Sequence, residues 1–149
     1  MQIRRAGPND AEAIADVFIP SFESLTFLPQ IHTHDETRGH ISRVVAAEEV
    51  WVAEDEGDIV GFAALTADML SHLYVHPDAQ GRSAGSALMD RAEERRPGGF
   101  TFWVFQENEH ARRFYEARGC RVLELTDGSG NEEKTPDALY EWRPEGKPS

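Results

Sequence analysis

The chain has 149 residues, which is the length of one ordinary domain. Fifteen Lys and Arg stand against 27 Asp and Glu, so the formal net charge is −12, and this disfavours binders of nucleic acid or anionic membranes, which need cations for phosphate contacts. Hydrophobic residues make up 40% of the chain, which excludes wholesale disorder, and the single cysteine, Cys120, excludes an intramolecular disulfide and a Cys-type zinc site.

The first part of the chain predicts a short strand and two helices. Asn9 and Glu12 form a capping-box pattern ahead of apolar residues at helical spacing, and Pro20 predicts that the first helix ends nearby. Thr33 and Glu36 form a second capping box, so a second helix should follow. The predicted ranges are a strand at 2–5, a helix from about 9 to 20, an unassigned stretch at 21–32 and a helix at 33–47.

From residue 50 onward, strand-like and helical patterns follow one another. Runs rich in β-branched and aromatic residues at 50–54 and 59–65 flank Asp55-Glu56-Gly57-Asp58, which predicts a hairpin. The run 100–105 is almost continuously apolar, as expected of a central strand covered on both faces. The remaining predicted elements are strands at 71–75, 121–125 and 138–142 and helices at 83–95 and 109–118.

The predicted order is βααββ, β, α, β, α, ββ, which indicates an α/β domain with a mixed sheet and helices on its faces. No repeat or linker divides residues 1–149, so we expect one domain, with 143–149 as a flexible tail. The polar, glycine-rich loop at 126–137 is long for a compact domain, and such loops are either mobile or close to a binding site.

The start of the chain carries charge without an apolar run behind it, and no stretch approaches the roughly 20 apolar residues of a membrane span. We therefore expect a cytoplasmic protein whose partners are neither membranes nor nucleic acids. The excess of acidic residues would suit a cationic or amine-bearing substrate, although a need for solubility explains this excess equally well.

The stretch at 73–88 carries the clearest chemical signal, because it is a strand, a short loop and the start of a helix. Small residues in the loop allow a ligand to approach the backbone, and the first helical turn offers unpaired N–H groups and the positive end of the helix dipole. Arg82 adds a positive charge. The stretch predicts a pyrophosphate cradle; the alternative is a tight turn that only packs a helix on a sheet. The small residues are Gly81, Ser83, Ala84 and Gly85.

This junction resembles that of the GNAT acetyltransferases, which transfer an acetyl group from acetyl-CoA to an amine. Their signature, [QR]-x-x-G-x-[GA], is similar to Gln80-Gly81-Arg82-Ser83-Ala84-Gly85, where Ser83 replaces the first glycine of the pair. A second motif of the family, N-x-x-A-x-x-F-Y-x-x-x-G, is matched by Asn108, Ala111, Phe114-Tyr115 and Gly119 after the run 100–105. Asn108 and Tyr115 are seven residues apart and so share one helix face. The alternative is that Tyr115 is an ordinary core aromatic.

The resemblance implies a mixed, mostly antiparallel sheet of about seven strands flanked by about four helices. It also implies that acetyl-CoA lies in a cleft where the strand 100–105 splays away from the strand 71–75. The residues that it assigns to cofactor binding are Leu73, Tyr74, Val75, Gln80, Gly81, Arg82, Ser83, Ala84, Gly85, Ser86, Asn108 and Arg112.

The implied reaction is direct attack of a primary amine on the thioester in a ternary complex. A backbone N–H near Val75 would polarise the thioester carbonyl, and Tyr115 would protonate the departing thiolate. A base must also deprotonate the amine; His72 is the first candidate and Asp68 the second, and both could equally be structural or solvated residues. Glu54 is a further candidate on an earlier strand.

The acceptor implied by the resemblance is an amine of a small molecule, peptide or protein, and His32, His34 and Phe27 lie in the region that often borders the acceptor site. The run His32-Thr33-His34-Asp35 is more typical of a solvated helix start than of a metal site, so we expect no metal. The alternative function is a catalytically weak CoA-binding or interaction domain, which Ser83 would favour. Homodimers are common in the family, and the sequence does not predict the oligomeric state.

Overall fold

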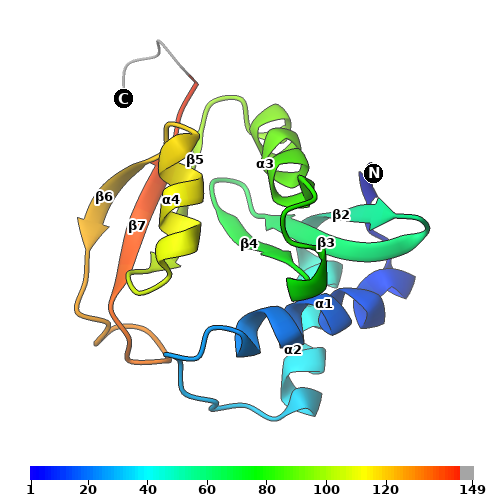
Figure 1. Cartoon of the computed structure of the whole chain (residues 1–149), viewed down its shortest axis with the longest axis horizontal. Coiled ribbons are helices and arrows are strands. Elements are labelled where there is room, and N and C mark those ends of the chain that lie inside the picture. The colour runs from blue at the N-terminus through cyan, green and yellow to red at the C-terminus, as the bar shows by residue number, and fades with distance from the viewer. Residues whose placement is uncertain (145–149) are drawn as a thin grey trace.

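The computed structural model describes residues 1–144, so most of the tail predicted at 143–149 lies outside the described residues. Within them, seven strands form two antiparallel sheets (Figure 1). The first sheet has the order β1-β2-β3-β4 and the second the order β5-β7-β6. The strands are β1 (Gln2–Arg5), β2 (Glu49–Asp55), β3 (Asp58–Leu65), β4 (Leu70–Val75), β5 (Phe100–Phe105), β6 (Arg121–Leu125) and β7 (Asp137–Trp142).

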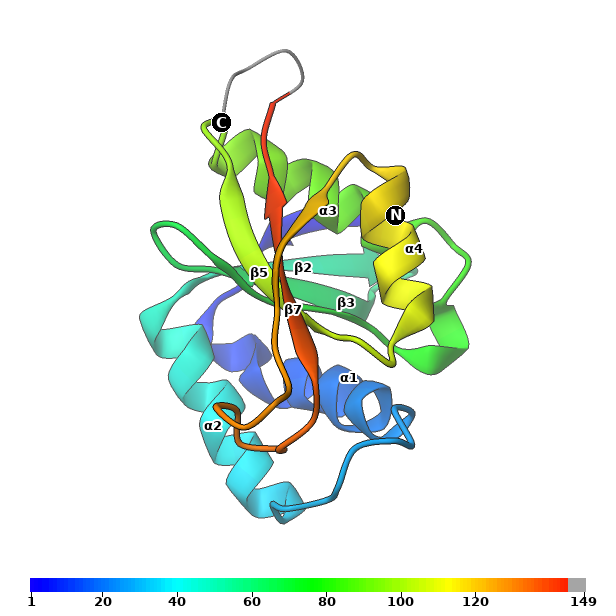
Figure 2. The same ribbon diagram turned by 90° about the vertical axis from the view of Figure 1, so that its left-hand side faces the viewer.

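Four α-helices cover these sheets, which confirms the predicted mixed fold (Figure 2). α1 and α2 pack on the face of the first sheet that carries Val52 and Phe62, and α3 packs on the opposite face against Ala63 and Leu65. Successive residues of β3 therefore serve opposite faces, as the two-residue period of a strand requires. α4 packs on the second sheet through Tyr115. The helices are α1 (Ala11–Glu23), α2 (His34–Ala47), α3 (Ala84–Arg95) and α4 (Glu109–Ala117), with short 3-10 turns η1 (Pro8–Asp10) and η2 (Pro77–Ala79).

β4 and β5 run parallel and are joined only where they begin. Met69 and Thr101 form an isolated parallel bridge, and the Thr101 N–H donates to the Asp68 carbonyl over 3.1 Å. Beyond that point no ladder joins the two strands in the described part of the chain, and they diverge (Figure 1). One edge of β4 is therefore left open, at the place where the family resemblance implied a splayed pair of strands.

The first helix continues past Pro20, where the sequence predicted its end. α1 runs to Glu23, and the Ser24 N–H still donates to the Pro20 carbonyl over 3.0 Å. Proline removes one helical hydrogen bond, but the buried side chains on both sides of it, Phe18 and Ser21, hold the segment against the sheet. Among the described residues, no helix is long and apolar enough to cross a membrane.

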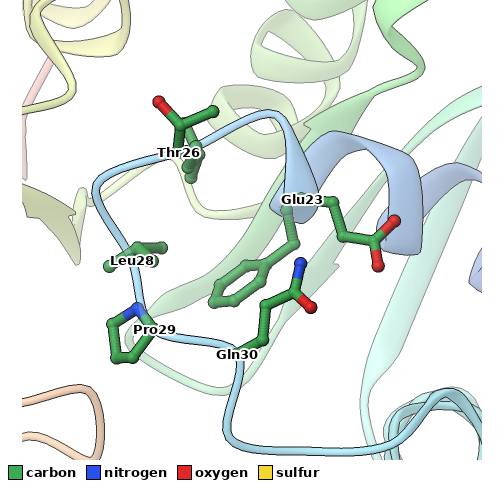
Figure 3. A pocket seen from close by; sticks show the side chains of 7 residues that line it. Glu23, Thr26, Leu28, Pro29 and Gln30 are labelled. Atoms are coloured by element: carbon green, nitrogen blue, oxygen red, sulfur yellow. The ribbon is translucent and has the colours of Figure 1, made fainter.

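The connection between α1 and α2, which the sequence left unassigned, folds back on the end of α1. It encloses a small hollow of about 180 Å³, and Figure 3 shows Glu23, Leu28 and Gln30 around it. Phe27 in the same connection packs on Phe105, with ring centroids 6.1 Å apart. The connection is therefore anchored against β5 as well as α1.

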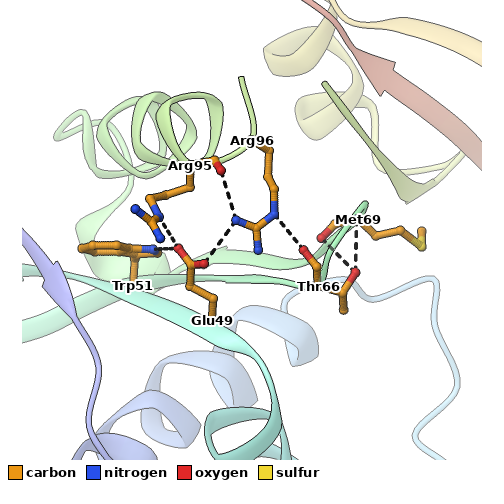
Figure 4. A network of polar contacts seen from close by, with 6 residues as sticks. All are labelled: Glu49, Trp51, Thr66, Met69, Arg95 and Arg96. Atoms are coloured by element: carbon orange, nitrogen blue, oxygen red, sulfur yellow. Dashed lines mark hydrogen bonds and ion pairs between the residues drawn. The ribbon is translucent and has the colours of Figure 1, made fainter. Parts of the chain in front are cut away.

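The carboxylate of Glu49 ties the end of α3 to the first sheet (Figure 4). It accepts hydrogen bonds from Arg95 (2.6 Å), Arg96 (3.1 Å) and the Trp51 indole (2.8 Å). Arg96 also donates to the Thr66 carbonyl over 2.9 Å, which extends the network to the β3–β4 turn. Burial opposes ionisation of Glu49, but the three donors outweigh it and hold its pKa at about 2.

Glu49→Gln is expected to lower the free energy of unfolding by about 2 kcal/mol at pH 7. Because the folded-state pKa lies below the unfolded value, the stabilisation is complete above about pH 4.5 and is lost as the pH falls toward 2. Urea unfolding of both proteins at pH 7 and pH 3 measures this. Glu94→Gln, which affects an exposed partner of Arg91, is the control and should change stability by less than about 0.5 kcal/mol. If Glu49→Gln lowered the free energy of unfolding equally at both pH values, the stabilisation would not come from the ionised Glu49 carboxylate.

Candidate active site

The open edge of β4 presents the backbone groups of alternate residues. The His76 N–H donates to the Val60 carbonyl across the β3–β4 pair, and hydrogen-bonding direction alternates along an antiparallel strand. The polar groups of Tyr74 therefore face β3, whereas those of Leu73 and Val75 face the diverging β5. The Val75 carbonyl accepts from Ser21 Oγ (2.9 Å), so the N–H groups of Leu73 and Val75 are the donors on this edge.

The loop after β4 reaches the start of α3 through two left-handed residues. Gly81 has φ 84°, and Ser83, the N-cap residue of α3, has φ 70° and makes no side-chain capping bond. The first-turn N–H groups of Ala84, Gly85 and Ser86 thus have no side-chain partner from the cap. Such a turn, with the positive end of the helix dipole behind it, suits an anion.

The two side chains predicted to flank this turn are turned toward the protein. Gln80 Nε2 lies 3.5 Å from the Val75 carbonyl oxygen, and the exposed Arg82 guanidinium lies 3.5 Å from the Asp55 carboxylate. A Cβ at Gly85 would lie 3.7 Å from the Phe114 ring, which is an ordinary contact, so the packing of α3 against α4 does not require glycine there.

Ser83→Gly is expected to raise the free energy of unfolding by about 1 kcal/mol, because a left-handed conformation costs serine about that much and glycine nothing. Replacing this N-cap residue should cost only about a few tenths of a kcal/mol of stability, since Ser83 forms no capping bond. We expect CoA affinity to stay equal or to become tighter. Thermal unfolding and calorimetric titration with CoA check both, and a tenfold loss of affinity would mean that the loop is not placed as described.

A cavity of about 930 Å³ adjoins the open edge of β4. It lies between α1, α2, β4, β5 and the β6–β7 loop, and it shares part of its wall with the hollow in Figure 3. Its lining combines aromatic rings with four histidines and five carboxylates. These residues are Phe18, Phe22, Tyr74, Trp103 and Phe105, then His32, His34, His40 and His72, and then Glu23, Asp35, Glu36, Glu132 and Glu133.

His72 lies in this cavity and is oriented by a short polar chain. Its Nδ1 lies 2.9 Å from Ser71 Oγ, and Ser71 in turn donates to the Glu48 carboxylate. In that arrangement Nδ1 carries the proton and Nε2 is left as an acceptor. Burial first, and His40 second, lower the pKa of His72 to about 4, so the imidazole is neutral at physiological pH. Asp68 is exposed and is not among the residues that line the cavity.

Tyr115 is 7% exposed and lies on α4, with its ring 4.4 Å from that of Phe102 on β5. Its hydroxyl has no hydrogen-bond partner among the described residues. Burial first, and the neighbouring phenol of Tyr74 second, raise the pKa of Tyr115 well above its usual range. The phenol therefore keeps its proton at any physiological pH and is a donor rather than a base.

Other residues on and beside α4 are bonded or buried within the protein. The Asn108 side-chain oxygen caps α4 by accepting from the Ala111 N–H over 3.2 Å. Arg112 donates to the Tyr140 hydroxyl over 2.9 Å and lies 3.9 Å from Glu116. Burial, with a lesser effect of Glu93, raises the pKa of the Cys120 thiol to about 12, so this buried thiol stays protonated and unreactive.

The sequence predicted some of the residues that line the cavity and missed others. His32 and His34 were candidates and do line the cavity, where they contact Glu132 and Glu23 respectively. Glu132 comes from the long glycine-rich loop, whose length was the only signal in the sequence. Ser71 and Glu48 had no signal, because they meet only when β3 pairs with β2 on one side and with β4 on the other.

The chain is similar to known proteins over most of its length. Residues 46–121 match the family model described as an acetyltransferase (GNAT) domain. An uncharacterized N-acetyltransferase from Archaeoglobus fulgidus is 30% identical over 89% of this chain and all of its own length. The peptidyl-lysine N-acetyltransferase YjaB from Salmonella typhimurium is 28% identical over 82% of this chain and 84% of its own. The PaiA N-acetyltransferase from Thermoplasma acidophilum, solved in complex with coenzyme A, aligns with a TM-score of 0.74 at 19% identity, covering 95% of this chain and 98% of its own.

Proposed function

The chain belongs to the GNAT acetyltransferase family, and we propose that it transfers the acetyl group of acetyl-CoA to a primary amine by direct attack in a ternary complex. The observation that carries the proposal is that the open edge of β4 adjoins both the uncapped start of α3 and a large acidic cavity. One side of the edge suits a pyrophosphate and the other suits a cationic amine.

The residues present fit an acyl-CoA. The first-turn N–H groups of Ala84, Gly85 and Ser86 would hold the pyrophosphate, and the edge of β4 at Leu73 and Val75 would bond the amides of the pantetheine arm. The structural neighbour crystallised with coenzyme A supports this placement at the level of the fold. Acetyl-CoA supplies the activated acyl group.

Three groups of the chain would then act on the reacting atoms. The Val75 N–H would stabilise the negative charge that develops on the thioester oxygen. Tyr115, which keeps its proton because burial raises its pKa, would give that proton to the departing thiolate. His72, whose Nε2 is free, would accept the proton that the amine loses; its lowered pKa keeps it in the neutral form that an acceptor needs but also makes it a weak base.

For the acceptor we propose the side-chain amine of a lysine in a peptide or protein. The YjaB relative carries the name of a peptidyl-lysine N-acetyltransferase, and the cavity has aromatic walls for an aliphatic side chain and carboxylates for its charge. A small polyamine has the same chemistry at its reacting end and belongs in the same test.

The test is a thiol-release assay with acetyl-CoA and a panel of lysine peptides, polyamines, amino acids and aminoglycosides. The proposal expects turnover of at least one cationic amine, with the lysine peptides preferred over free amino acids. Tight binding of acetyl-CoA without turnover of any amine would contradict it and would support a CoA-binding domain that retains the fold.

A further inference from the structure

The carboxylates of the cavity differ in what they are bonded to. Glu23 is bonded to His34 over 2.8 Å, and Glu132 is bonded to His32. Glu36 accepts from the Thr33 N–H over 2.8 Å as part of the capping box of α2. For the Glu133 carboxylate, no hydrogen bond or ion pair to another described residue is formed, although the residue is half-buried. Glu133 is thus a carboxylate at the cavity surface whose charge is not already balanced.

The loop that carries Glu133 is held in a fixed shape. Gln106, at the end of β5, donates to the backbone carbonyls of Thr126 (2.8 Å) and Asp137 (2.9 Å), which closes the base of the loop. Asn131 donates to the Thr135 carbonyl over 2.6 Å and so bridges the residues on both sides of Glu133. A Cβ at Gly128 would lie 2.3 Å from the Thr135 backbone, so the two limbs of the loop touch. The backbone of Glu133 is therefore positioned before any substrate arrives.

Glu133 lines the same cavity as Tyr74 and His72. It is near enough to the Tyr74 phenol that, after burial, it is the second cause raising the pKa of Tyr74 to about 12. Tyr74 and His72 both lie on β4, the strand whose open edge is proposed to bind the acyl-CoA. The lining residue with a permanent positive charge is Arg43, which lies on α2.

We infer that Glu133 binds the ammonium group of the acceptor and so determines the preference of the enzyme for cationic amines. The inference rests on the proposed function and adds a residue and a substrate class to it. The carboxylate would form a charge-assisted hydrogen bond to the ammonium beside Tyr74, while the aliphatic part of the acceptor lies along Trp103 and Phe105. Glu133 holds the amine, and the proton leaves to His72.

Steady-state kinetics of Glu133→Gln test this. For a lysine peptide with a blocked N-terminus, we expect KM to rise at least tenfold, kcat to change less than threefold, and the Kd of acetyl-CoA to stay the same. For an aromatic primary amine, which is uncharged at pH 7.5, we expect KM to be unchanged. Glu124→Gln is the matched control, because it makes the same change at an exposed side chain on β6 that does not line the cavity, and it should change each constant less than twofold.

Two results would overturn the inference: an unchanged KM for the lysine peptide, or a loss confined to kcat, which would make Glu133 a proton acceptor instead. If the wild-type protein turned over no amine, the proposed function would fail separately. Calorimetric titration of the CoA-bound protein with the lysine peptide would still decide the role of Glu133. Binding at least tenfold weaker in Glu133→Gln would support it, and equal binding would overturn it. The thermal midpoint should not change, since the side chain bonds to no other described residue.

Discussion

Tyr115→Phe is expected to lower kcat for acetyl transfer at least 100-fold while the Kd of acetyl-CoA changes less than twofold. A positioned general acid contributes about 10²–10⁴ to the rate, and the phenol hydroxyl is the only group that the substitution removes. The ring remains packed on Phe102, so the core is preserved. Stopped-flow or steady-state thiol release at saturating acetyl-CoA gives kcat, and calorimetry gives the affinity.

The control for this prediction is Tyr140→Phe. Tyr140 is a second buried phenol, whose ring centroid is 6.4 Å from that of Tyr115, and it donates to Glu116 over 2.5 Å and accepts from Arg112. Loss of the Tyr140 hydroxyl should lower the stability of the protein by about 1–2 kcal/mol and leave kcat within a few-fold of the wild-type value. If the two variants had the same kcat, Tyr115 would not be the acid.

The second large effect is expected for Ser86→Asp, which should weaken CoA binding at least 50-fold. Ser86 lies in the first turn of α3, where the pyrophosphate is proposed to bind, and a carboxylate there would repel its negative charge. The same substitution should stabilise the free protein by about 0.3–1 kcal/mol, since an acidic residue in the first turn interacts favourably with the helix dipole.

Ser86→Asp should weaken CoA binding but stabilise the free protein, and these opposite effects distinguish a role of the α3 start in binding from a role in folding. Thermal unfolding of the free protein and titration with CoA measure them on the same sample. Ser129→Asp adds the same charge to an exposed position of the β6–β7 loop and should leave CoA affinity unchanged. A Ser86→Asp protein that bound CoA as tightly as the wild type would exclude the start of α3 as the pyrophosphate site.

The sequence predicted the fold well, because helices and strands depend on local patterns, whereas the cofactor-binding residues stay a prediction. The capping box of Thr33 and Glu36 begins α2 as expected. The exception among the helices is α1, where packing of Phe18 and Ser21 outweighs the local preference of Pro20 to end it. Ser83 shows a similar conflict, since the loop geometry imposes a left-handed conformation that its residue type disfavours.

The acceptor side was harder to predict, because its residues come from segments far apart in the chain. His32 and Glu132 are 100 positions apart, and they meet only because the β6–β7 loop reaches the α1–α2 connection (Figure 1). The chain from His72 through Ser71 to Glu48 similarly depends on the register of the first sheet. Neither spacing nor residue type along the chain indicates such contacts, whereas the length of the 126–137 loop did indicate a segment that is either mobile or close to a binding site.

The account depends on acyl-CoA occupying the divergence of β4 and β5, and a crystal structure of the protein with CoA tests this most directly. It should show the pyrophosphate on the amides of Ala84, Gly85 and Ser86, the pantetheine arm along Leu73 and Val75, and the sulfur facing Tyr115. Coenzyme bound elsewhere, or β4 and β5 paired along their whole length, would contradict it.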